Sequence, residues 1–482
     1  MKYKFKTRPY GHQLDILKKS WEKENYAIFA DMGTGKSKII IDNIAVLYDR
    51  GKINGALIIA PKSITGNWDS LEIPAHMPEH VDYRSIVWSP EKTKKQQKII
   101  HELFVLSEQL VIFIINIEAL STKRGAEITY KFLLGHRALL VIDESTTIKN
   151  PKAARTRNII KMRDLAKYKR ILTGMPVTKT PLDLYAQCYF LDPYLLDFGS
   201  YYAFKSRYTI TRKINLPGRH SFDQVIKYVR LDELNQKLSS FSTRILKEEC
   251  LDLPEKIYLK RNIELTPEQK QAYMEMKKYG VATLQEGETM SAVNALAQLI
   301  RLHQITCGHV KTDNAREVKS IKNNRIAELL ALLEETNDHK IIIWAVYRYD
   351  IREIAKHLEK IYGTDSVATF YGDTDPKIRQ EIVNKFQDKD SDLRFLVANP
   401  KTGGYGLTLT ARHTVIYYSN SYDLEIRMQS EDRAHRISQT EKVTYIDIIA
   451  KGTIDEKIVK SLRNKINLAT QVLGEDVKKW LI

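Results

Sequence analysis

The sequence predicts an α/β protein of two lobes, each a parallel sheet with helices on both faces, with a helical insertion between them. At 482 residues the chain is too long for one ordinary core. Short β-branched runs occur in two series, and segments of helical period separate the runs. We expect a first lobe over residues 1–240, a crossover and helical insertion over 241–330, a second lobe over 331–455 and a C-terminal helical brace over 456–482.

The first series of apolar runs predicts the strands of the first lobe. Strands buried on both faces of a parallel sheet are nearly continuously hydrophobic, and the longest of these runs is far too short to span a bilayer. The runs are residues 26–30, 56–60, 110–115, 138–142 and 170–172.

A second series begins near residue 340 and predicts a second sheet. Its runs are residues 341–345, 366–370, 395–398, 414–418 and 443–449. Residues 180–330 interrupt the rhythm with tyrosine-rich, charged and helix-like stretches, which predicts the helical insertion. Residues 454–473 alternate charged and apolar side chains at helical spacing, so we expect a helix that packs back onto a lobe.

The net charge and the cysteine content indicate the kind of binding partner and the compartment of the protein. The net charge of +17 and the pI near 9.4 suit a polyanion, of which nucleic acid is the commonest, although a generally lysine-rich surface would give the same values. The cysteines, Cys188, Cys250 and Cys307, are far apart, which favours a reducing compartment. We expect no zinc site at His303, Cys307 and His309, because no fourth ligand is near them in sequence.

A glycine-rich loop at residues 30–37 predicts a phosphate-binding site. It lies between an apolar run and a helical segment, the strand–loop–helix context in which backbone N–H groups surround a polyphosphate. Ala30 occupies the place of the usual first glycine. Lys36 would reach the β- and γ-phosphates, and the Ser37 hydroxyl would bind Mg²⁺. The predicted nucleotide contacts in the loop are Gly33, Thr34, Gly35, Lys36 and Ser37.

Two adjacent acids follow the apolar run at 138–142. Ligands of open α/β sheets bind at the carboxyl ends of strands, so Asp143 and Glu144 can face the phosphate loop. Asp143 would hold Mg²⁺, and Glu144 would orient and deprotonate the attacking water.

A catalytic charge donor is predicted in the second lobe. Residues 429–439 carry Arg433 and Arg436 at i, i+3, which would place them on one face of a helix. Guanidinium groups stabilise the charge that develops on a γ-phosphate, and hydrolysis would then be coupled to closure of the lobes. Without the other motifs, a solvated helix face or salt bridges would be the alternative explanation for Arg433 and Arg436.

The order of these motifs resembles that of the SWI/SNF-type ATPases of helicase superfamily 2, which are double-stranded DNA translocases. The resemblance extends over nearly the whole chain. The form Gln-x-x-x-Arg-x-His-Arg-Ile-x-Gln at 429–439 is particularly specific for this branch. The matching segments are residues 8–13, 31–37, 57–63 with 66–68, 116–120, 143–150, 172–177, 244–256, 402–410 and 429–439.

The resemblance implies two RecA-like lobes, the use of ATP and Mg²⁺, and roles for further residues. Gln13 would read the adenine, and Gly406 would contribute to the nucleotide site. Thr173 and Gln429 would couple hydrolysis to movement. Ordinary core packing is the alternative for Trp68. The implied contacts to DNA phosphates are Lys62, Asn67, Trp68, Lys401 and Thr402.

The sequence departs from the family pattern at four positions. Thr146 replaces a histidine, Met175 a threonine, Thr408 an asparagine and Ser438 a glycine. None of these changes removes a group needed for hydrolysis.

We therefore expect an ATP-dependent translocase that binds duplex DNA through its backbone, tolerates any sequence and remodels DNA or protein–DNA complexes. The alternatives are a strand-separating or fork-remodelling helicase and a nucleotide-gated DNA clamp; an RNA-dependent ATPase fits the last motif less well. We expect a monomer in the cytoplasm of a bacterium or a phage-infected host, associated with the nucleoid and not with a membrane. The sequence does not identify a recruiting partner.

Overall fold

In the computed structural model the described residues are 3–91, 93–105, 108–215, 221–283, 289–292, 294–312, 318–336, 340–403, 409–410, 413–436 and 439–475. The chain divides into two compact units. Unit 1 contains Met1–Leu251 and a C-terminal segment that begins at Asn467, and unit 2 contains Asp252–Ile466. The four segment boundaries expected from the sequence stay a prediction.

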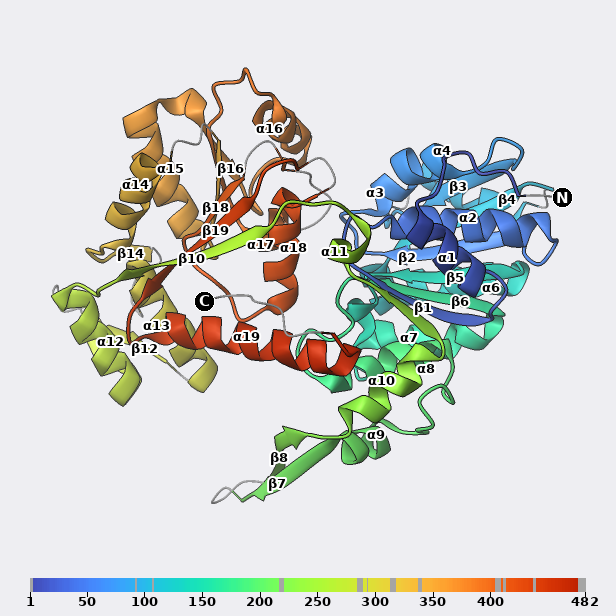
Figure 1. The fold of residues 1–482 in the computed structure, drawn as a ribbon, viewed down its shortest axis with the longest axis horizontal. Helices are drawn as coiled ribbons and strands as arrows, with labels where there is room; N and C mark the ends of the chain where they lie inside the picture. The colour runs from blue at the N-terminus through green and yellow to red at the C-terminus, as the bar shows by residue number, and fades with distance from the viewer. Residues whose placement is uncertain are drawn as a thin grey trace. The chain divides into compact units, whose positions relative to one another are not determined.

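Unit 1 contains a seven-stranded parallel sheet in the order β3-β4-β2-β5-β6-β1-β9 (Figure 1). All five predicted strands are present. The sequence did not predict β3 and β9, which lie at the two edges of the sheet and are mostly half-buried, so polar residues interrupt their apolar pattern. The strands are β1 (Asn25–Ala30), β2 (Gly55–Ala60), β3 (Tyr83–Val87), β4 (Leu110–Asn116), β5 (Ala138–Asp143), β6 (Tyr168–Thr173) and β9 (Ser242–Ile245).

Helices cover both faces of this sheet. Leu57 and Ile59 of β2 point into one apolar cluster, and Ala56 and Ile58 point into another, because side chains alternate along a strand. Helix α2 (Lys36–Asp49) packs in the second cluster, and α6, α7 and α8 pack in the first. The other helices of unit 1 before its C-terminal segment are α1 (Gly11–Ser20), α3 (Thr65–Asn67), α4 (Ile73–His76), α5 (Lys94–His101), α6 (Lys123–Gly135), α7 (Ala154–Met162), α8 (Leu184–Leu191), α9 (Tyr201–Tyr208), α10 (Leu231–Ser239) and α11 (Lys247–Cys250).

Unit 2 contains a six-stranded parallel sheet in the order β10-β19-β18-β15-β17-β16. The five strands of the second predicted series are present, and the prediction of two helix-covered parallel sheets is confirmed. Strand β10 comes from the segment between the two series and pairs with β19 along its full length. The strands are β10 (Lys256–Ile263), β15 (Ile341–Trp344), β16 (Val367–Phe370), β17 (Phe395–Ala398), β18 (Thr414–Tyr417) and β19 (Val443–Ala450).

The segment between the two series contains the expected helices and also strands that the sequence did not predict. Its described residues form antiparallel hairpins, which are β7 (Thr209–Ile214) with β8 (Phe222–Tyr228), β11 (Val281–Thr283) with β12 (Thr289–Ser291), and β13 (His309–Lys311) with β14 (Val318–Ser320). The helices of unit 2 are α12 (Pro267–Tyr279), α13 (Ala295–Cys307), α14 (Arg325–Glu335), α15 (Arg348–Tyr362), α16 (Pro376–Gln387), α17 (Pro400–Gly403) and α18 (Leu424–Ala434).

The last helix, α19 (Ile454–Leu473), has the bounds that the sequence predicts. Ile458 and Leu462 are buried in the part that belongs to unit 2. Ala469 and Val472, in the part that belongs to unit 1, pack in the first apolar cluster of that unit. Among the residues described, no helix has the length and hydrophobicity needed to span a membrane.

Candidate functional site

The topology of unit 1 brings the predicted motifs to one edge of the sheet. Strands β2, β5, β6 and β1 are consecutive neighbours and all run in the same direction, so their carboxyl ends share an edge. The phosphate loop follows β1, the acidic pair lies at the end of β5, and Thr173 is the last residue of β6. Residues distant in sequence therefore form one site.

The loop has a backbone suited to an anion. Gly33 and Gly35 have φ of 82° and 84°, a left-handed conformation that glycine adopts without steric cost. Gly35 directly precedes α2, whose first residue is Lys36, so unpaired N–H groups of the helix start lie at the loop. The Lys36 ammonium donates to the carbonyl oxygens of Ala30 and Asp31, at 2.8 and 3.2 Å, which holds the side chain against the loop.

Gln13 is buried against the same loop. Its amide Nε2 donates to the Thr34 carbonyl at 3.1 Å, and its Oε1 accepts the Tyr10 N–H at 3.0 Å. A Cβ at Gly35 would lie 2.1 Å from Gln13 Nε2, so a side chain at position 35 would displace the Gln13 amide in addition to straining the left-handed backbone. Because a glutamine amide has two N–H donors and two acceptor lone pairs, one of each remains for a base.

Asp143 is a buried carboxyl at the carboxyl end of β5. Its Oδ2 accepts the Trp68 indole N–H at 2.9 Å, and its Oδ1 accepts the Glu144 backbone N–H at 3.0 Å. Burial raises the pKa of Asp143, whereas the Lys36 charge and the Trp68 hydrogen bond act in the opposite direction. Asp143 is therefore electrostatically coupled to the phosphate-loop lysine.

Glu144 has a strained backbone. Its φ of 52° is left-handed, which costs free energy for a residue with a Cβ and often marks a functional position. The Thr173 hydroxyl donates to Glu144 Oε2 at 3.4 Å and accepts the Met175 N–H at 3.1 Å. The hydroxyl of Thr173 thus links the acidic pair to residues 172–177.

An ion-pair network that the sequence did not predict holds Asp31 of the phosphate loop. The Arg244 guanidinium lies 2.9 Å from Asp31 Oδ1 and 2.6 Å from Glu475 Oε1, and it donates to the Gly174 carbonyl at 3.1 Å. The Lys247 N–H donates to Asp31 Oδ2 at 3.1 Å. Arg244 and Lys247 belong to a segment matched to the family, but Glu475 lies 231 residues from Arg244 and in no motif.

Trp68 is buried beside the acidic pair. Only 2% of the residue is exposed, and its indole N–H is bonded to Asp143, which favours the core-packing alternative over the predicted contact with DNA. Lys62 is exposed and Asn67 is half-buried, at the carboxyl-end side of β2. Lys401 is exposed and Thr402 half-buried in α17, which follows β17 in unit 2. The DNA roles of these four residues stay predictions.

In unit 2, α18 carries part of the predicted arginine motif. Gln429 and Arg433 are buried on this helix. Within the described part of the chain, neither amide atom of Gln429 has a hydrogen-bond partner. The helix ends at Ala434, so the expectation that Arg433 and Arg436 share a helix face is wrong; Arg436 lies beyond the end and donates through Nε to the Asp432 carbonyl at 3.1 Å. Gly406, Thr408 and Ser438 lie outside the described residues.

The oxygen groups of the loop edge suit Mg²⁺ bound together with a nucleotide. The residues described contain no group of three or more His, Cys, Asp or Glu side chains arranged to hold a metal ion. Mg²⁺ is usually bound by one or two protein groups together with substrate phosphates. Ser37, at the start of α2, and Asp143 would supply those protein groups.

The fold and this edge define a two-unit α/β protein with a phosphate loop of the nucleoside-triphosphatase type. Residues 12–311 match the SNF2-related domain, and residues 322–438 match the helicase conserved C-terminal domain. The chain belongs to the SNF2-related family, which confirms the resemblance seen in the motif order.

The curated relatives that this chain resembles include proteins named as ATP-dependent helicases. An uncharacterized ATP-dependent helicase of Mycoplasma pneumoniae is 28% identical over 453 residues, which are 93% of this chain and 40% of the relative. The putative ATP-dependent helicase/translocase YwqA of Bacillus subtilis is 28% identical over 463 residues, 94% of this chain and 46% of the relative. The chain thus spans less than half the length of either relative. The Sulfolobus solfataricus SWI2/SNF2 ATPase core in complex with dsDNA is 23% identical with a TM-score of 0.43, covering 98% of this chain and 94% of that one.

Proposed function

We propose that this protein is a DNA-dependent ATPase that moves along duplex DNA. The observation that carries the ATPase proposal is the arrangement at the edge of the unit 1 sheet, where the buried Asp143 lies within the electrostatic reach of Lys36. A phosphate loop beside a carboxylate is the minimum that phosphoryl transfer from a Mg²⁺–nucleotide requires.

Each residue of this edge has a chemical task in the proposal. Loop N–H groups and Lys36 bind the phosphates, and Ser37 and Asp143 hold the metal, which when bound neutralises charge on the β- and γ-phosphate oxygens. Glu144 orients the attacking water and accepts its proton. The hydrogen bond of 3.4 Å between Thr173 and Glu144 couples the position of the Glu144 carboxylate to the segment of residues 172–177 that carries Thr173. Gln13 binds the adenine with its remaining donor and acceptor.

Unit 2 supplies the remaining groups in this proposal. Arg433 and Arg436 stabilise the charge on the γ-phosphate, and Gly406 contributes to binding the nucleotide. The buried amide of Gln429, which has no hydrogen-bond partner in the part of the chain that the structure describes, supports a ligand-dependent role, because leaving such a group unpaired costs about 1–3 kcal/mol. Gln429 would gain a partner when nucleotide is bound.

Duplex DNA is the proposed track. The net charge of +17 and membership of the SNF2-related family support a nucleic-acid partner. Lys62, Asn67, Lys401 and Thr402 would contact phosphates, which position a protein on DNA without reading its sequence. Binding should therefore tolerate any sequence and weaken steeply with salt.

ATP turnover measured alone and with duplex DNA, single-stranded DNA or RNA tests this proposal. We expect stimulation mainly by duplex DNA; stimulation by RNA alone would contradict the proposal.

Variants of the site residues test their individual roles. Lys36→Ala should abolish turnover, and Glu144→Gln should bind ATP but hydrolyse it very slowly, because glutamine retains the shape of the side chain without the base. Arg436→Ala should bind ATP with turnover lowered at least about 100-fold. Normal turnover of Arg436→Ala would refute its catalytic role.

A further inference from the structure

Most residues of the hairpin formed by β7 and β8 in unit 1 are exposed. In Figure 1 it extends away from helices α9 and α10. Ile210, Phe222 and Ile226 are 52%, 49% and 57% exposed, although isolated two-stranded hairpins are at best marginally stable in water. Apolar side chains that stay exposed on a projecting element indicate a binding surface.

The base of the hairpin is firmly attached to unit 1. Tyr208 is fully buried in the first apolar cluster, and its hydroxyl donates to Glu233 of α10 at 3.0 Å. Arg207 pairs with the same carboxylate, and the Val229 N–H donates to the Tyr208 carbonyl at 3.0 Å. The exposed strands are therefore held by a fixed base.

The strand register separates the side chains into two different faces. Cross-strand partners in an antiparallel pair lie on the same face, and successive residues of a strand alternate between faces. Arg212 pairs with Gln224 and Ile214 with Phe222 in regular register. Ile210 lies on the same face of β7 by alternation and pairs with Lys227, on the other side of a register shift between Ile210 and Thr211 at which β8 has one extra residue. We call Ile210, Arg212, Ile214, Phe222, Gln224 and Lys227 the apolar–basic face. The opposite face has Lys213 directly across from Asp223, the one acidic residue of the described hairpin.

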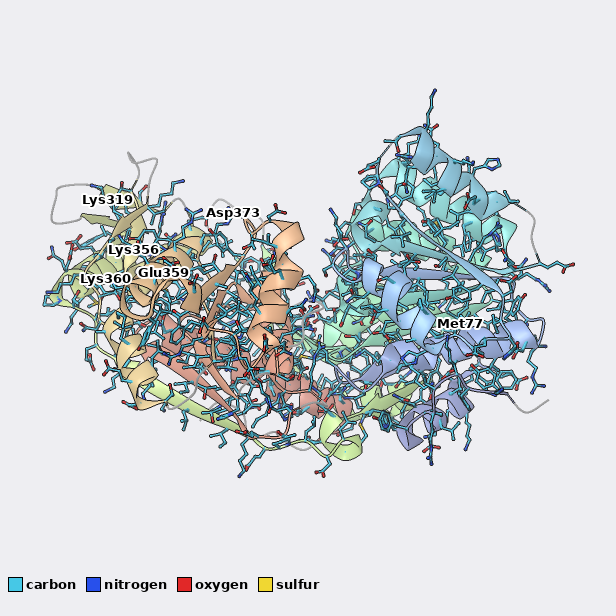
Figure 2. All side chains as sticks on the ribbon, turned by 90° about the horizontal axis from the view of Figure 1, so that it is seen from above. Met77, Lys319, Lys356, Glu359, Lys360 and Asp373 are labelled. Carbon is cyan, nitrogen blue, oxygen red and sulfur yellow. The ribbon has the colours of Figure 1, made fainter. Side chains whose placement is uncertain are left out.

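The cations of the apolar–basic face have no partners among the described residues. Arg212 and Lys227 are exposed and, as far as the structure describes the chain, neither forms a hydrogen bond or an ion pair. Two exposed arginines of helix α15 differ, because Arg348 and Arg352 both pair with Asp373, which is labelled in Figure 2. Unlike these two arginines, Arg212 and Lys227 have no carboxylate partner among the residues described.

We propose that the apolar–basic face of the β7–β8 hairpin binds the sugar–phosphate backbone of duplex DNA. Arg212 and Lys227 bind phosphates, Gln224 donates to a phosphate or sugar oxygen, and Phe222 and the isoleucines pack on the sugars. A two-stranded β-ribbon has the width to enter the major groove of B-DNA. The choice of DNA as the occupant rests on the proposed function, whereas the existence of the face rests on the register and exposure alone.

Two neighbouring charge reversals test the proposal, measured as affinity of the full chain for a labelled blunt duplex at several salt concentrations. Arg212→Glu should weaken binding about tenfold at low salt and lower the slope of log affinity against log salt by about 1. Lys213→Glu, the matched control on the opposite face, makes the same charge change one residue away and should weaken binding less than about twofold. Lys227→Glu, from the other strand, should behave like Arg212→Glu.

The outcomes separate this proposal from the proposed function. If duplex DNA stimulates ATP turnover and all three variants bind it like the unsubstituted protein, the hairpin proposal is wrong and the proposed function stands. If Lys213→Glu weakens binding as much as Arg212→Glu, the effect is one of net charge and the assigned face is wrong. If the unsubstituted protein neither binds duplex DNA nor is stimulated by it, both proposals fail.

Discussion

The hydrogen bond from the Trp68 indole N–H to Asp143 affects the pKa of the Asp143 carboxyl. Burial raises the pKa of Asp143, and the indole N–H, which binds the ionised carboxylate, partly offsets that effect. Metal binding needs the ionised form. The acid limb of ATP turnover should therefore lie above the ordinary range of an aspartate, because activity is lost as pH falls through the raised pKa.

Replacing Trp68 with phenylalanine tests this dependence. Loss of the donor removes a contact that favours the charged form, so the pKa of Asp143 rises further and the acid limb of kcat/KM should move up by about one pH unit. Trp88→Phe is the matched control, because Trp88 is also buried in unit 1 but stacks on Arg124 away from the loop. An unshifted limb in Trp68→Phe would show that Asp143 does not control it.

At the scale of single residues, the sequence predicts those site residues that belong to a motif of neighbouring positions. The loop glycines, Lys36 and the acidic pair belong to contiguous motifs, and β1, β5 and β6 bring those motifs to one edge as expected. The hydrogen bond from Trp68 to Asp143 was not predictable, because the two residues are 75 positions apart in sequence. Glu475 was missed for the same reason, since only the folded chain places it beside Arg244.

At the scale of elements, the central strands were predictable, but the edge strands β3, β9 and β10 were missed and, of the edge strands described, β16 was predicted. Central strands such as β2 are apolar on both faces, whereas β9 (Ser-Thr-Arg-Ile) is half-buried throughout and β10 mixes charged with apolar residues and exposed with buried ones. The end of α18 was missed because Arg436 matches the helical spacing, although the helix stops at Ala434. Helix α19 was predicted correctly because its long amphipathic repeat is a local property.

A buried ion pair fastens α19 to the rest of unit 2. Asp455, in its first turn, pairs with the fully buried Arg325 of α14 and accepts the Thr306 hydroxyl at 2.8 Å. Arg325 also donates to the Ile448 carbonyl of β19 at 2.8 Å. Burial alone would raise the pKa of Asp455, but Arg325 and His303 outweigh it and lower the pKa below its usual value.

Asp455→Asn should lower the free energy of unfolding of unit 2 by about 3 kcal/mol, because it leaves the Arg325 charge buried without a counter-ion. Chemical denaturation measures the loss. Since the folded pKa of Asp455 is depressed, this stabilisation is present above the unfolded-state pKa and is lost as pH falls through the folded-state pKa. Glu335→Gln, which breaks the exposed pair with Arg261, should change stability by less than about 1 kcal/mol. Equal losses in the two variants would contradict the role of the buried pair.

At the scale of the whole molecule, the chain contains two helix-covered parallel sheets with separate cores, and motifs of the SNF2-related family are distributed over both units. We propose that hydrolysis requires groups from each unit, so that ATP turnover can be coupled to movement along DNA. A fork-remodelling helicase and a nucleotide-gated clamp would use the same nucleotide edge. What distinguishes them is whether ATP drives the protein along an intact duplex.

Displacement of a third strand from a duplex measures that movement directly, because a translocating protein removes the strand without separating the duplex beneath it. We expect ATP-dependent triplex displacement by the full chain, none by Lys36→Ala, and poor unwinding of a simple fork. ATP turnover stimulated by duplex DNA without triplex displacement would contradict translocation and favour the clamp. Efficient fork unwinding with the triplex left intact would instead identify a strand-separating helicase.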